Sequence, residues 1–329
     1  MPTRPRRGLL AVLALMLCAA LVAITWVVTS GEDTERSTDS ASRPPPTTSQ
    51  SDTAPGPPAG QVPVTVVKID NVESARPQSG LDTADVVYVE PVEGGYTRLA
   101  AVYAAEVPEV AGPVRSARET DVELLAQYGN PSLVFSGAAP EIEPVLVESD
   151  VRLVRHSDHP DAFYREPARP SPHNLYARLS LLPRVDGPRP EQVLPRGDAP
   201  SDGRPTAEHT VAYEHERYGF TWSPELRRWR ASLDGEPLTS VGVGLVSTAT
   251  VVVQRVDIVA DEDVRDAAGT PSPVARTVGT GPATVLRDGR AFEGTWSRPS
   301  AEEGTRFTTE SGQPLPLADG PVWVLLVPR

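Results

Sequence analysis

The chain has 329 residues, and its 31 lysines and arginines against 44 aspartates and glutamates give a formal net charge of −13 at pH 7. This acidic balance argues against a nucleic-acid partner, because contacts to phosphate require local basicity. The single cysteine, Cys18, lies near the N-terminus, so the remainder of the chain has neither disulfides nor thiol chemistry.

The N-terminus carries the clearest targeting signal. Three arginines precede an uncharged apolar run from Leu9 to Val28, and about 20 apolar residues suffice to span a bilayer core. An acidic stretch follows, so the positive-inside rule places residues 1–8 in the cytoplasm and the main part of the chain outside. We therefore predict a single-pass anchor in the cell membrane over residues 9–29. A cleaved secretory signal and lipidation at Cys18 are the open alternatives.

Composition divides the rest of the chain into segments. Residues 30–61 are rich in Ser, Thr, Pro, Gly and Asp, which predicts a disordered tether. Over 62–185, apolar strand-like runs alternate with helix-like stretches, which predicts a mixed α/β domain. A connector rich in Pro, Gly, Asp and Arg covers 186–208. Short β-branched and aromatic runs over 209–329 predict a mostly β domain, and the expected fold class is therefore α+β.

Local patterns predict the elements within these segments. In the first domain we expect strands over 62–70, 86–92, 96–104, 132–137 and 151–156. Gly94 and Gly95 predict the turn between the second and third strands. We expect one helix to start at Ser116, where S-x-x-E matches a capping box, and two more over 140–148 and Leu175–Leu182. In the second domain, Asp288-Gly289 predicts a tight hairpin.

Several motifs occur together in one order. They are "IDNVESARPQSGLDTADVVYVEPVEGGYTRLAAVY", "GPVRSAR" and "PHNLY", followed by "GTGPATVLRDGRAFEGTWSR" and "VWVLLVP". Over residues 61–329 the chain resembles the bacterial YerB-like family, whose two parts are classed as domains of unknown function, DUF3048. The resemblance implies an exported protein of the cell envelope that is tied to the membrane, often as a lipoprotein. It implies no reaction.

The "GPVRSAR" segment predicts an anion site. With Ser116 as the helix cap, Arg115 and Arg118 would lie at the N-terminus of the helix, next to free backbone N–H groups. Two guanidiniums and those donors suit a carboxylate or another small anion. The alternative is that Glu119 and Asp121 neutralise both arginines locally.

Two further pairs are candidate site residues. Glu93 and Arg98 flank the Gly-Gly turn, and they either face one cleft, with Glu93 as an acid or base, or form a surface ion pair worth at most about 1 kcal/mol. His173, in "PHN", titrates near neutral pH, and Asn174 can cap the predicted helix that follows. His173 is, after Glu93, the second candidate for a catalytic role. The PHN segment either lines a groove or ties down a loop.

No metal or cofactor is predicted. The H-x-x-H pattern of His156 and His159 lies in a Pro-containing loop and lacks the ligand spacing of a typical zinc site. Sequence signatures of common hydrolases, metalloproteases and nucleotide-binding proteins are absent from the chain.

Together these patterns predict a membrane-anchored, extracytoplasmic binding or scaffold protein. Its expected ligand is an anionic group, a cell-wall polymer or an envelope protein, contacted by Arg98, Arg115, Ser116, Arg118, His173 and Asn174. The alternative is a cell-wall glycan hydrolase or lyase that uses Glu93 with the three arginines. The sequence leaves open whether any reaction is catalysed, which ligand binds, and the oligomeric state.

Overall fold

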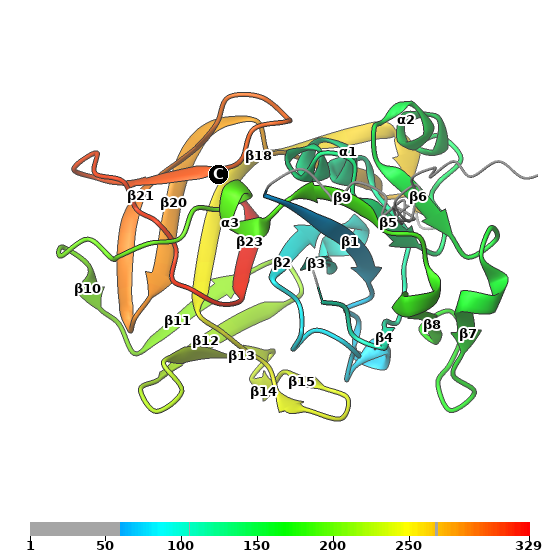
Figure 1. Cartoon of the computed structure of the whole chain (residues 1–329), viewed down its shortest axis with the longest axis horizontal. Helices are drawn as coiled ribbons and strands as arrows, with labels where there is room; N and C mark the ends of the chain where they lie inside the picture. The colour runs from blue at the N-terminus through cyan, green and yellow to red at the C-terminus, as the bar shows by residue number, and fades with distance from the viewer. Residues whose placement is uncertain (1–59, 105, 267–268) are drawn as a thin grey trace, which may run out of the picture. The chain divides into compact units, whose positions relative to one another are not determined.

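A large mixed sheet forms the centre of the structure (Figure 1). The computed structural model describes residues 60–104, 106–266 and 269–329, so the predicted anchor and nearly all of the predicted tether lie outside the described residues. The sheet has 13 strands, and its main path runs β10-β21-β20-β18-β23-β2-β3-β1-β5-β6. These strands are β1 (Gln61–Ile69), β2 (Val86–Pro91), β3 (Thr97–Ala104), β5 (Ser132–Phe135), β6 (Arg152–Arg155), β10 (Arg204–Pro205), β18 (Thr250–Arg265), β20 (Gly279–Arg287), β21 (Arg290–Arg298) and β23 (Val322–Pro328), with β9 (Val185–Pro188), β19 (Pro271–Arg276) and β22 (Arg306–Thr309) paired to them.

The strand β23 lies in the middle of this sheet. It pairs in parallel with β2 on one side and with β18 on the other, so that Val322 lies opposite both Val86 and Thr250. All of its residues from Val322 to Val327 are buried, as expected for a parallel strand covered on both faces. The sheet therefore continues from the strands before the connector into those after it.

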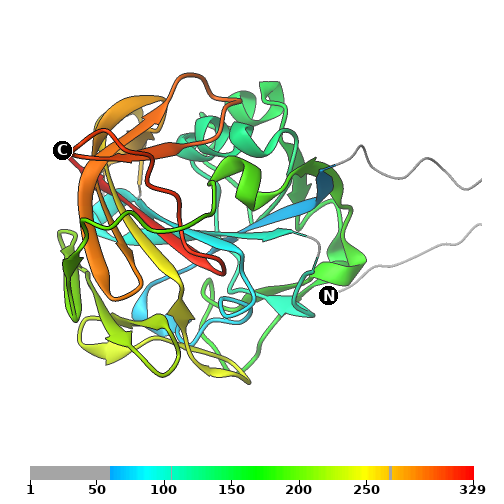
Figure 2. The same ribbon diagram turned by 60° about the vertical axis from the view of Figure 1, so that its left-hand side comes forward.

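Smaller sheets and short helices cover the two faces. A five-stranded sheet packs on one face, and α1 and α2 lie on the other (Figures 1 and 2). Tyr218 and Phe220 of the smaller sheet contact Trp323 of β23 edge-on, with ring centroids 6.2 Å apart in each pair. The smaller sheet comprises β11 (Glu208–Ala212), β12 (Arg217–Ser223), β13 (Arg228–Leu233), β14 (Glu236–Pro237) and β17 (Ser247–Thr248); two further sheets comprise β15 (Thr239–Ser240) with β16 (Gly244–Leu245), and β4 (Val110–Ala111) with β7 (Phe163–Arg165) and β8 (Leu175–Arg178).

The fold is mostly β with few helices, which corrects the mixed α/β architecture expected for 62–185. The α-helices of the described residues are α1 (Glu119–Leu125), α2 (Glu143–Glu148) and α3 (Pro190–Val193). The same described part contains no helix that is both long and apolar enough to cross a bilayer.

One helix prediction is wrong, and another helix forms but starts three residues later than predicted, for a common reason. The helix expected over Leu175–Leu182 is instead strand β8 and a single 3-10 turn, because residues 175–178 pair with β4 and β7. The helix expected from Ser116 starts at Glu119. Residues 115–117 are extended instead, because the N–H of Arg115 donates to Lys68 (2.8 Å) and the N–H of Ala117 donates to Gly137 (3.0 Å). In both places non-local pairing overrides local periodicity.

Several strand and turn predictions are confirmed. β1, β2 and β3 lie within one residue of the predicted ranges. Gly94 and Gly95 both have positive φ in the turn between β2 and β3. Asp288 and Gly289, with φ of 50° and 70°, join β20 to β21, as the Asp-Gly pair of a tight hairpin requires.

Candidate functional site

The candidate site lies where β1, β2 and β3 meet the start of α1. Lys68 of β1 lies on the sheet face that α1 covers, as do Glu90 of β2 and Arg98 of β3, which are register partners. The extended segment 114–117 runs beside the end of β1, where Ile69 bridges Val114. We call Arg98, Arg115 and Arg118 the arginine cluster.

A buried ion-pair network lies next to the arginine cluster. The ammonium of Lys68 lies 2.7 Å from Glu90 and 2.8 Å from Asp121, and all three side chains are almost fully buried. Burial and the charge of Asp121 raise the pKa of Glu90, while Lys68 opposes that rise. Asp121 also accepts the backbone N–H of Arg118 at 2.7 Å. The network therefore fixes β1, β2 and the start of α1 relative to one another.

Arg118 is fully occupied by the protein itself. Its Nε and Nη2 donate to one carboxylate oxygen of Glu93 at 3.2 and 2.7 Å, and its Nη1 donates to the carbonyl of Ala117. The other oxygen of Glu93 accepts from Ser272 at 2.6 Å. Partial burial would raise the pKa of Glu93, but the hydrogen bonds and charge of Arg118 hold it below its usual value. Glu93 is thus kept ionised, which suits a general acid poorly.

Arg98 is the cation of the cluster without a counter-charge. Its side chain is buried, with 7% of the residue exposed, and Nη1 donates to the carbonyl of Ser116 at 3.2 Å. Nε is buried and has no partner, and no carboxylate among the described residues pairs with this guanidinium. Burial and the charges of Arg118 and Arg115 lower the pKa of Arg98 to about 9. The charges of Asp70 and Glu93 oppose this fall without contacting the guanidinium, so Arg98 is a buried cation that has no carboxylate in contact with it among the described residues.

Asp70 orients the two remaining basic groups. Its Oδ2 lies 3.0 Å from Nε of Arg115 and 2.7 Å from Nδ1 of His173. The carboxylate is buried, whereas the side chains of Arg115 and His173 are 25% and 22% exposed. Within the described part of the chain, both terminal nitrogens of Arg115 and Nε2 of His173 have no hydrogen-bond partner. One buried carboxylate thus hydrogen-bonds His173 and forms an ion pair with Arg115, although Nε of Arg115 makes no hydrogen bond.

Ser116 and Asn174 have structural rather than capping positions. Ser116 lies in the extended segment and contributes its carbonyl to Arg98. Asn174 accepts from Arg165 at 2.8 Å and donates to the carbonyls of Glu166 and Arg169. It therefore closes the loop that presents His173, and a strand rather than a helix follows it.

The structure brings six of the seven predicted site residues into one run of contacts. Asp70 connects His173 to Arg115, whose neighbour Ser116 accepts from Arg98, and Arg118 connects to Glu93. The seventh residue, Asn174, points into its own loop. Sequence reasoning missed Lys68 and Asp70, although one signal was available: Lys68 is the only lysine of the chain and lies in an apolar strand.

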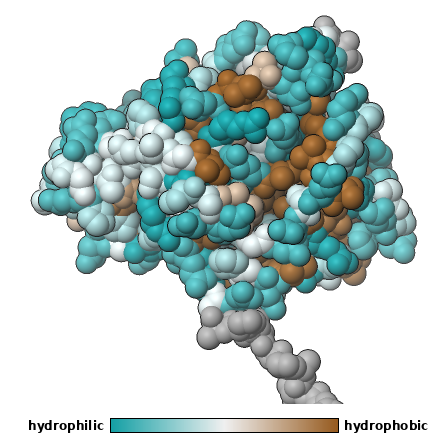
Figure 3. Space-filling view, turned by 90° about the horizontal axis from the view of Figure 1, so that it is seen from above, coloured by the Kyte–Doolittle hydropathy of each residue, from teal (hydrophilic) through white to brown (hydrophobic). Residues whose placement is uncertain are grey.

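Two hollows lie close to these residues, and of the predicted site residues only Glu93 lines one of them. A hollow of about 340 Å³ lies beside Glu93, between Tyr96, Tyr213 and Pro271, and no arginine lines it. Another of about 540 Å³ lies between α2 and the β18–β19 ribbon, on the face where hydrophobic patches alternate with hydrophilic residues (Figure 3).

The described residues contain no group of three or more side chains that could bind a metal ion. His156 and His159 therefore belong to no such group.

Comparison with known protein families gives two matches. Residues 48–187 match "Protein of unknown function (DUF3048) N-terminal domain", and residues 209–324 match the corresponding C-terminal domain. The chain belongs to the DUF3048 family. The resemblance inferred from the sequence motifs is thereby confirmed.

One relative of this chain is a protein from Bacillus subtilis. The chain is 27% identical over 278 residues to "Putative lipoprotein YerB" of Bacillus subtilis (strain 168), and the match covers 81% of each protein. The crystal structure of YerB protein from Bacillus subtilis matches with a TM-score of 0.69 at 21% identity, over 82% of this chain and 92% of that one. The DUF3048 fold is therefore shared between the two proteins.

Proposed function

We propose that this protein is an envelope-associated, extracytoplasmic binding protein that recognises an anionic group at Arg98, Arg115 and His173. The relative from Bacillus subtilis carries the description "Putative lipoprotein YerB", and the apolar run from Leu9 to Val28 supports attachment of this chain to a membrane.

The uncompensated charge of Arg98 is the observation that carries the proposal. Removing the partner of a buried ion leaves an uncompensated charge that destabilises a fold by several kcal/mol. An anion bound beside Arg98 would take the place of the absent counter-ion, and its binding would therefore stabilise the folded protein. Charge-assisted hydrogen bonds to a bound carboxylate or phosphate are about twice as strong as neutral ones.

The surroundings of Arg98 favour the same kind of ligand. The three guanidiniums of the cluster face two carboxylates, Asp70 and Glu93, so the site is locally cationic in a chain of net charge −13. Asp70 hydrogen-bonds Nδ1 of His173 and forms an ion pair with Nε of Arg115, and within the described residues the outer nitrogens of both side chains have no protein partner. Planar guanidinium donors match both carboxylates and phosphates. A cell-wall polymer or an envelope protein that presents such groups fits this chemistry.

Catalysis has weaker support. Glu93 is held ionised by Arg118 and Ser272, and Glu90 is buried behind Lys68. Neither carboxyl group therefore combines access with a proton to donate, as the usual acid–base glycosidase route requires.

Titration of the full-length protein with inorganic phosphate and with acetate tests the proposal. Calorimetry would compare the wild type with Arg98→Gln, which keeps hydrogen-bond donors but removes the charge. We expect affinity for at least one anion to fall by about 10-fold or more, as loss of a charge-assisted bond predicts.

The matched control is Arg230→Gln, at an exposed arginine of β13. It removes the same charge at another surface and should leave affinity unchanged. Equal loss in both variants would reduce the effect to net charge, and wild-type affinity in Arg98→Gln would refute the proposed site.

A further inference from the structure

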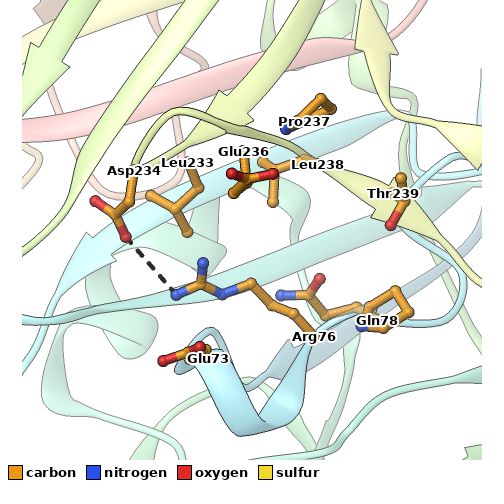
Figure 4. Close-up of a pocket in the computed structure, with 10 residues that line it drawn as sticks. Glu73, Arg76, Gln78, Leu233, Asp234, Glu236, Pro237, Leu238 and Thr239 are labelled. Carbon is orange, nitrogen blue, oxygen red and sulfur yellow. Dashed lines mark ion pairs between the residues drawn. The ribbon is translucent and has the colours of Figure 1, made fainter.

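A third hollow, of about 550 Å³, lies between two segments that are far apart in the sequence (Figure 4). The residues Glu73–Gln78 form one wall, and the opposite wall is the β13–β14 hairpin together with the residues that follow it to Thr239. No residue of the arginine cluster lines this hollow. It is therefore distinct from the proposed anion site.

The lining has an excess of negative charge. Glu73, Asp234 and Glu236 contribute three carboxylates, and Arg76 is the one cation among the lining residues. Arg76 does not neutralise them closely, because its Nη2 lies 3.8 Å from Asp234 and its Nε donates to the carbonyl of Asn71 at 3.1 Å. Two negative charges remain in excess at the rim.

Gln78 supplies an independent sign of an absent ligand. The residue has no exposed surface, and its Nε2 donates to the carbonyl of Asp70 at 3.2 Å and to Oδ1 of Asn71 at 3.0 Å. Both partners are acceptors, which fixes the orientation of the amide. Its Oε1 is therefore an acceptor, and within the described residues no donor reaches it. Figure 4 shows this oxygen directed across the hollow, toward the wall that carries Leu238 and Thr239.

The remaining walls suit an alkyl chain. Leu233 and Leu238, which are both buried in the protein, and Pro237 contribute the apolar part of the lining. Long basic side chains bury their methylene stems on such surfaces while the charged end meets polar groups.

We propose that this hollow binds a primary alkylammonium group, such as a lysine-type side chain presented by a peptide. The ammonium supplies the N–H donor that Oε1 of Gln78 lacks. The carboxylates of Asp234 and Glu236 balance its charge, and its methylenes pack on Leu233 and Leu238. The protein then has a second site, with a charge preference opposite to that of the arginine cluster.

Two peptides that differ only in the ammonium group test this inference. The probes are acetyl-Gly-Lys-Gly-amide and the same peptide with norleucine in place of lysine, titrated into the full-length protein and followed by calorimetry and NMR. We expect saturable binding of the lysine peptide and none of the norleucine peptide. Equal binding of both, or no binding of the lysine peptide at millimolar concentration, would overturn the proposal.

Variants locate the binding to this hollow. Asp234→Asn with Glu236→Gln keeps the shapes of both side chains, and we expect it to weaken binding of the lysine peptide by about tenfold. The control Glu208→Gln removes a carboxylate from an exposed position of β11 and should have no effect. Arg98→Gln should also leave this affinity unchanged, which separates the result from the fate of the anion site. Undiminished binding in the double variant would place the ammonium elsewhere and refute the assignment.

Discussion

Arg98 and Glu90 lie directly opposite each other on β3 and β2, yet they form no ion pair. Opposite charges at such positions ordinarily interact across the strands. Here the carboxylate of Glu90 binds Lys68 at 2.7 Å instead, and Arg98 keeps only the carbonyl of Ser116. Lys68 thus takes the carboxylate that lies opposite Arg98, which leaves this guanidinium without a contacting carboxylate among the described residues.

The first prediction follows from this withheld partner. Arg98→Met removes a buried charge that has no counter-ion, so we expect the free energy of unfolding in the absence of ligand to stay the same or rise by about 1 kcal/mol. Phosphate binding should be lost in the same samples. Urea denaturation and calorimetry measure the two quantities, and a stability loss above about 2 kcal/mol would show that Arg98 is needed by the fold itself.

The second prediction concerns Lys68. Lys68→Met leaves Glu90 and Asp121 buried without their shared cation, so we expect a loss of about 3–5 kcal/mol in the free energy of unfolding. Chemical denaturation measures the loss. Adding Glu90→Gln removes one of the two orphaned charges and should recover part of it. If the double variant is no more stable than Lys68→Met alone, the two residues are not energetically coupled.

The third prediction is a pH dependence. The pKa of Glu93 in the folded protein lies below its ordinary value of 4.5, so ionised Glu93 stabilises the fold above that pH. This contribution is lost as the pH falls through the lowered value. We expect Glu93→Gln to be less stable than the wild type near neutrality and to lose less stability on acidification from about pH 6 to about pH 3. Thermal denaturation over this range measures both, with Glu214→Gln at an exposed side chain as the control.

The fourth prediction concerns the contact between the two sheets. Trp323 is 1% exposed and packs against Tyr218 and Phe220. Trp323→Ala should therefore cost about 3–5 kcal/mol through the cavity that it leaves. Leu226→Ala, at a side chain that is half exposed, should change stability by less than about 0.5 kcal/mol. Similar losses in the two variants would contradict this assignment of the core.

Strands were predictable where local chemistry and pairing agree. β1 is rich in β-branched residues, and the Asp288-Gly289 turn has a backbone conformation that few other residue pairs adopt readily. Helices were overpredicted because spacing alone cannot register a distant partner. The residues after Ser116 have helical spacing, but backbone groups of Lys68 and Gly137 hold residues 115–117 extended.

The sequence named some residues of the candidate site but neither Lys68 nor Asp70, and it did not predict the internal pairing. Its motifs offered Arg98, Arg115 and His173 as candidates, but whether they lie together depends on the fold. Nothing local shows that Asp70, a long way before His173 in the chain, is the carboxylate that orients it. Nor does the sequence show which arginine lacks a contacting carboxylate. That depends on two pairings in the fold, Lys68 with Glu90 and Arg118 with Glu93.

The central place of β23 has a consequence for biosynthesis. β2 and β18 are both made before β23, and each presents an unpaired edge until the later strand arrives between them. Unpaired edges are templates for aggregation, and parallel pairing between distant segments forms slowly. A nascent chain that stalls before residue 322 would therefore expose two unpaired strand edges at once.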